Sequence, residues 1–181
     1  ILKIEESYLN GKQLNIISEY FEGETLKDFL SHEHKKDRRF LKEEIIWKIF
    51  IQISLALYRI HSKNIIHRNI RPSSILLNWN YNAKITYFKN AYLLKTENDL
   101  CKEEIGPKDY MAPEIWKKEE YNTKSDIWSL GALLYEMCSF NKPFSDENEA
   151  NLKEKIINSK YASLGNKYSK ELTGLIDNML R

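Results

Sequence analysis

The sequence predicts an α+β domain in which helices dominate and the strands are few and short. Three patterns predict it: a hairpin-like start, a long helix with one apolar face, and a later helix that is apolar on nearly every side. A helix of the last kind usually lies at the centre of a domain. With 181 residues, the chain is long enough to bury one sizeable core.

The start of the chain is predicted to form a β-hairpin followed by a short helix. Residues 1–8 and 14–20 read as two strands, with apolar alternation around a turn that contains Asn10 and Gly11. A break at 22–24 then precedes a short helix over 25–32.

The clearest helix of the first half covers residues 41–61. Its apolar residues are spaced by three or four positions and therefore share one face: Ile46, Ile49, Ile53, Leu57 and Ile60. Short strands are predicted at 75–77 and 83–87, before an exposed, irregular loop over 89–110. The remaining helices are predicted at 126–138, 152–157 and 172–180.

Composition excludes two classes of partner and favours one compartment. The net charge of +2 gives no case for nucleic-acid binding, and the basic stretch 34–39 is explained by a solvated loop. No window has the length of a membrane span, and no signal peptide is visible. Cys101 and Cys138 lie far apart, which favours a reducing, cytoplasmic or otherwise intracellular setting.

Five segments carry patterns that periodicity does not explain. They read LNIISEYFEG (14–23), HRNIRPSSILL (67–77), YFK (87–89), MAPE (111–114) and DIWSLG (126–131). In order and spacing they resemble the hinge, the catalytic loop, the Asp-Phe-Gly motif, the end of the activation segment and the central helix of eukaryotic protein kinases. Residues 124–144 look most similar to the NIMA-related Ser/Thr kinases.

The resemblance implies a protein-kinase-like fold, mainly the helical C-terminal lobe with the last strands of the N-terminal lobe. Residues 1–181 would be a partial kinase domain without its final helices. Within it, 1–22 would be the end of the N-lobe and the hinge, and 23–181 the C-lobe.

Four positions of the implied catalytic centre depart from the family. Asn69 stands where the family has its Asp base, and an amide does not accept a proton at neutral pH. Ser74 and Tyr87 stand at the two magnesium-binding positions, and Lys89 replaces the glycine of the metal-binding motif. Arg71 keeps a cation in place of the family's Lys. We therefore expect no metal site and no efficient phosphoryl transfer.

Other positions match structural parts of the family. His67 and Phe88 correspond to its buried hydrophobic spine, which Ile4 would extend, and Leu76 to the residue under the adenine ring. Burial is expected for Ile4, Leu76 and Phe88. Asp126 would hold the backbone of the catalytic loop by hydrogen bonds.

The activation segment carries a hypothesis of its own. In the family, the residue matching Arg68 commonly meets a phosphorylated side chain, and Glu103 falls where NIMA-related kinases have an activating Thr. A fixed carboxylate would replace the phosphate, although Glu103 beside Glu104 also fits a solvated acidic pair. Pro107 replaces a family Thr, and Glu114 finds no Arg partner before Arg181.

For nucleotide binding, the resemblance implies a hinge at Ser18, Glu19, Tyr20 and Phe21. The six glycines contain no glycine-rich loop. Binding of ATP, if present, is expected to be weak and independent of magnesium.

Three functions fit the sequence. The first is a pseudokinase that acts on other proteins, such as an active kinase, as an interaction or regulatory module. The second is an active or weakly active ATP-dependent Ser/Thr kinase in which residues such as Lys84 or Asp99 compensate. The third is a decaying gene product without a selected role.

Overall fold

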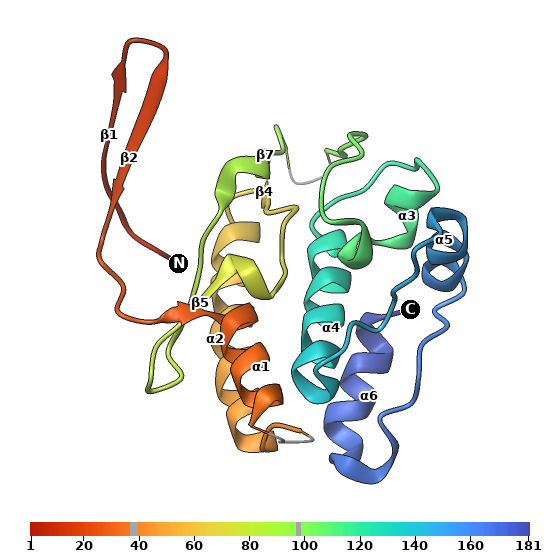
Figure 1. Ribbon diagram of the computed structural model, residues 1–181. Helices are drawn as coiled ribbons and strands as arrows, with labels where there is room; N and C mark the ends of the chain where they lie inside the picture. The colour runs from red at the N-terminus through yellow and green to blue at the C-terminus, as the bar shows by residue number, and fades with distance from the viewer. Residues whose placement is uncertain (37–39, 97–98) are drawn as a thin grey trace.

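The computed structural model describes residues 1–36, 40–96 and 99–181. A hairpin projects from one side of a mainly helical body, and α2, α4 and α6 run through that body (Figure 1). The strands are β1 (Ile4–Asn10), β2 (Gln13–Ser18), β3 (Glu24–Thr25), β4 (Ile65–Ile66), β5 (Ile75–Leu77), β6 (Ala83–Ile85) and β7 (Tyr92–Leu93). The α-helices are α1 (Leu26–Lys35), α2 (Glu43–His61), α3 (Pro113–Trp116), α4 (Lys124–Ser139), α5 (Glu149–Ile157) and α6 (Lys170–Met179).

The predicted hairpin is confirmed, with its strands shifted by a few residues. β1 and β2 pair antiparallel with Leu9 opposite Leu14, and Gly11 adopts the left-handed φ of +60° that the turn requires. The two strands form a sheet of their own. Ile4 is 57% exposed, so its predicted burial is wrong. The reason is that no layer of the described residues covers this sheet.

Helix α1 begins at a side-chain cap and runs further than predicted. The Thr25 hydroxyl accepts a hydrogen bond from the backbone N–H of Asp28, as N-cap residues do. Because α1 continues to Lys35, part of the predicted basic loop is helical. Residues 37–39, the rest of that stretch, lie outside the described residues.

A three-stranded antiparallel sheet, in the order β3-β5-β6, lies beside α1. Strand β3 was not predicted, because two residues show no alternation. Its approach to β5 depends on Gly23: a Cβ at this position would lie 2.3 Å from the carbonyl oxygen of Leu77. Glycine is therefore the residue that lets the chain enter β3.

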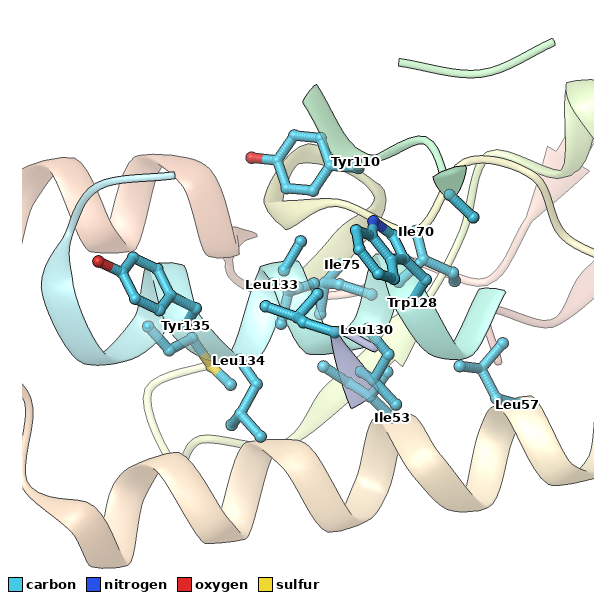
Figure 2. Close-up of a cluster of buried hydrophobic side chains, with 14 of the residues drawn as sticks. Ile53, Leu57, Ile70, Ile75, Tyr110, Trp128, Leu130, Leu133, Leu134 and Tyr135 are labelled. Atoms are coloured by element: carbon cyan, nitrogen blue, oxygen red, sulfur yellow. The ribbon is translucent and has the colours of Figure 1, made fainter. Parts of the chain in front are cut away.

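The core forms where α2 faces α4. The five predicted face residues of α2 are at most 3% exposed, which confirms the predicted helix and its orientation. Helix α4 is buried on nearly all sides, as its composition predicts. Figure 2 shows Leu130, Leu133 and Leu134 of α4 packed with Ile53 and Leu57 of α2. Each such side chain contributes about 1.5–3 kcal/mol when it is fully buried.

Helix α6 packs closely against α4 at Gly131. A Cβ on Gly131 would lie 2.8 Å from Cβ of Met179 and 3.2 Å from Cδ2 of Leu180. Gly174, in α6 itself, has open space around the equivalent position.

Within the described residues, no helix combines the length and apolarity needed to cross a bilayer.

We predict opposite effects of alanine at these two helical glycines. Gly131→Ala should lower the free energy of unfolding by about 1–3 kcal/mol, because the new methyl group overpacks the α4–α6 contact. Gly174→Ala should be neutral or stabilise by up to about 1 kcal/mol, since alanine favours helix and meets nothing. Denaturant unfolding of the two variants measures both effects, and equal destabilisation would contradict the close contact.

Candidate functional site

The site is organised by Asp126, in the first turn of α4. Its side chain is 1% exposed, and its two oxygens accept hydrogen bonds from the backbone N–H groups of His67 (2.8 Å) and Arg68 (2.9 Å). His61, at the end of α2, places Nε2 2.8 Å from Oδ2 of Asp126. Arg68 has a φ of +61°, a conformation that costs a non-glycine residue about 1–3 kcal/mol. The carboxylate therefore holds the loop in a shape that it would otherwise not favour.

His67 joins this loop to the segment after β6. Its ring is fully buried, and Nε2 lies 3.0 Å from the carbonyl oxygen of Thr86. Nδ1 accepts a hydrogen bond from the backbone N–H of Asn69 (3.3 Å), which assigns the ring proton to Nε2. Burial lowers the pKa of His67 and so favours this neutral form. The half-buried Phe88 packs edge-on against the His67 ring, with the two ring centroids 4.8 Å apart.

Ser74 has a structural role in the loop. It is fully buried, and its hydroxyl lies 2.7 Å from the carbonyl oxygen of Asn69 and 2.8 Å from that of Arg71. The same oxygen accepts the backbone N–H of Arg71 at 3.1 Å. These contacts use the hydrogen-bonding capacity of the hydroxyl within the loop.

Tyr87 occupies the other position at which the family binds magnesium. Tyr87 has a left-handed φ of +64°, and its side chain is 59% exposed. Magnesium prefers hard, charged oxygen ligands, whereas Tyr87 offers a phenol and Ser74 a hydroxyl that is already engaged. The residues at these positions therefore do not fit the magnesium ions that the family binds.

Two further residues complete the centre. Asn69 is 8% exposed, and among the described residues Nε of Arg71 is buried without a hydrogen-bond partner. Lys89 is exposed.

The hinge residues already make contacts within the chain. The backbone N–H of Glu19 donates to the carbonyl oxygen of Lys3 at 3.0 Å, so it is not available to a ligand. The Glu19 carboxylate accepts Nζ of Lys84 at 2.7 Å, and the same ammonium lies over the ring of Phe21. Ser18 is exposed, and Tyr20 is 90% exposed. Leu76, half-buried on β5, lies opposite Lys84 in the sheet.

The activation segment meets the catalytic loop at Arg68. Nη1 of Arg68 lies 2.6 Å from Oε2 of Glu103, the contact expected for a carboxylate that stands in for a phosphate. The side chain of Arg68 is 6% exposed, and its guanidinium donates to the carbonyl oxygen of Asn90 and lies over the ring of Tyr92. Glu103 thus supplies the charge that faces a nearly buried cation.

Two residues that no sequence motif marks also hold Glu103. The hydroxyl of Tyr121 donates to the carbonyl oxygen of Glu103 at 2.6 Å. Tyr121 is itself fixed by an isolated antiparallel bridge to Cys101, two residues before Glu103. This bridge joins segments twenty residues apart, so local spacing gives no sign of it.

The end of the activation segment is tied to α4, to α5 and to the segment between them. Lys108 pairs with Glu149, Asp109 with Lys142 (2.5 Å), and the hydroxyl of Tyr110 bonds to Glu136. Three successive side chains, 108–110, are therefore engaged within the chain.

Glu114 shows no ion pair among the described residues. It is half-buried, and burial raises the pKa of its carboxyl group.

Comparison with known proteins assigns the fold. The protein kinase domain family matches residues 1–181. The chain belongs to this family. Its relatives include Nek2 of Mus musculus (36% identical over 172 residues, 92% of this chain and 39% of the relative) and Nek8 of Danio rerio (37% over 181 residues, 99% and 25%), both named serine/threonine-protein kinases. Nek11 of Homo sapiens is 36% identical over 180 residues, 99% of this chain and 28% of the relative.

These matches confirm the kinase-like fold and the NIMA-related likeness that the motifs predict. The chain spans only about a quarter to two fifths of the length of these relatives.

The Glu103 hypothesis leads to a matched pair of variants. Glu103→Ala should raise the rate of protease cleavage within 99–110 about fivefold, because the buried Arg68 loses its counter-charge and the segment opens more often. Glu104→Ala removes a neighbouring exposed carboxylate and should leave the cleavage rate unchanged. Limited proteolysis with mass mapping measures both, and identical rates for the two variants would refute the role of Glu103.

Proposed function

We propose that this protein kinase domain is a pseudokinase that works as an interaction or regulatory module and does not transfer phosphate efficiently. The observation that carries the proposal is the hydroxyl of Ser74, which is buried and bonded to Asn69 and Arg71 at one of the family's metal-binding positions. Where the family has a metal ligand, this chain has a hydroxyl that bonds to the backbone of its own loop.

The proton-transfer step supports the same proposal. Asn69 occupies the position of the base, and its amide does not accept a proton at neutral pH. Loss of a general base costs about 10²–10⁴ in rate. The phenol of Tyr87 at the second metal position adds the loss of charge neutralisation, on which phosphoryl transfer chiefly depends.

An active kinase would need compensating groups, and the two candidates in the sequence are engaged elsewhere. The ammonium of Lys84 pairs with Glu19. The carboxylate of Asp99 accepts the backbone N–H groups of Lys95 and Leu100, each at 3.0 Å. These contacts favour the pseudokinase over a divergent active enzyme.

The proposal places the domain among other proteins inside the cell. Its partners would be proteins, and an active kinase is one class that a kinase-shaped module suits. The free thiols of Cys101 and Cys138 favour a reducing compartment.

The test measures the natural full-length protein that contains this domain. We predict that ATP raises its melting temperature equally with and without magnesium, or not at all, and that no phosphate reaches a generic protein substrate. Stabilisation by a ligand follows RT ln(1 + [L]/Kd), so even weak binding is visible at high ATP. The matched gain-of-function control carries Asn69→Asp, Ser74→Asn, Tyr87→Asp and Lys89→Gly. These substitutions restore the family's residues at the four positions that depart from it.

Contradiction would come from the unmodified protein. Magnesium-dependent stabilisation together with turnover would overturn the proposal, provided that Asn69→Ala abolishes the turnover. That variant separates activity of this domain from a contaminating kinase.

A further inference from the structure

A cavity of about 310 Å³ lies between α1 and the turn that joins β5 to β6, outside the degraded catalytic centre. Its lining includes the aromatic residues Phe29, Trp79 and Tyr81 and the ionisable residues Glu24, His32, Glu33 and Lys36. Its size is at the lower end of the range for ligand sites, enough for one large side chain.

Hydrogen bonds hold the turn that carries Trp79 and Tyr81. Oδ1 of Asn78 accepts the backbone N–H groups of Asn80 (3.0 Å) and Asn82 (2.9 Å), which closes the turn. Gln52 of α2 donates to the carbonyl oxygen of Tyr81 at 2.9 Å and so ties the turn to the helical body. Trp79 is nevertheless 75% exposed. A large exposed indole on a rigid turn is typical of the anchors of protein interfaces.

The charges of the cavity favour a cation. Oε2 of Glu24 lies 2.9 Å from Nδ1 of His32, a residue that carries charge only when protonated. Glu33 faces the ammonium of Lys36 at 2.9 Å, so those two charges offset one another. Glu24 is then the carboxylate whose charge has no permanent cation among its described contacts.

We propose that this cavity binds an arginine side chain of a partner protein. A guanidinium is planar, stacks on aromatic rings and pairs with a carboxylate through two parallel N–H groups. Phe29 and Tyr81 contact each other edge-on, so the exposed indole of Trp79 would stack on a face of the guanidinium. Glu24 would accept its N–H groups beside its contact with His32. This site is separate from the catalytic loop, so the proposal holds whether or not the domain transfers phosphate.

The experiment follows the tryptophan indole N–H signals by NMR during titration with two small probes. N-acetyl-arginine amide carries the guanidinium, and N-acetyl-citrulline amide is its neutral isostere. The indole of Trp79 should shift with the arginine probe and bind the citrulline probe about fivefold more weakly, as expected for loss of a cation–aromatic contact. The signal of Trp47, which lies on α2 outside this cavity, is the internal control.

Three variants assign the effect. Trp79→Ala removes a mostly exposed side chain and should abolish arginine binding, followed in this variant through the backbone amide signals of residues 78–82. Glu24→Gln should remove the preference for arginine over citrulline. Glu22→Gln, a neighbouring exposed carboxylate outside the cavity, should keep that preference. Equal binding of both probes would overturn the proposal, and so would arginine binding that survives Trp79→Ala.

Discussion

The hydrogen bonds of Asp126 to the catalytic-loop backbone are the constraint on which the rest of the site depends. They join the most buried helix, α4, to a loop that would otherwise avoid the left-handed conformation of Arg68. That conformation in turn directs the guanidinium of Arg68 toward Glu103, while His67 reaches Thr86. One buried carboxylate thereby sets the catalytic loop and the starting point of the activation segment. The buried pair of helices α2 and α4 supplies the rigid base that this arrangement needs.

The residue that fixes the backbone of this loop, Asp126, is separate from those at the family's catalytic positions. Hydrogen bonds that shape the loop are present, but the groups that would act on a phosphate are replaced by Asn69, Ser74 and Tyr87. The hydroxyl of Ser74 illustrates the separation, because it strengthens the loop at a position where the family binds metal. In the activation segment, a fixed carboxylate at Glu103 makes a contact that does not depend on modification. The contacts that shape the loop are therefore made by other atoms than those at which the family binds metal and substrate.

How much the sequence predicts depends on the range of the interactions involved. Long helices such as α2 and α4 follow from periodicity, because their buried faces repeat over several turns. Strands of two residues, such as β3, carry no such repeat. The expectation for Ile4 was wrong because burial needs a covering layer, which its own strand does not reveal. In the site, ordered motifs predict that Arg68 and Glu103 meet, whereas the support from Tyr121 arises through a bridge between distant segments.

The most direct test of this account is amide hydrogen exchange at His67 and Arg68 in the Asp126→Asn variant. The amide of asparagine keeps one acceptor oxygen but loses the charge and the second acceptor, so at least one of the two backbone N–H groups loses its partner. We predict that protection of these amides falls by about tenfold or more, while amides in the centre of α2 keep theirs. Unchanged protection at both residues would contradict the claim that Asp126 holds the catalytic loop.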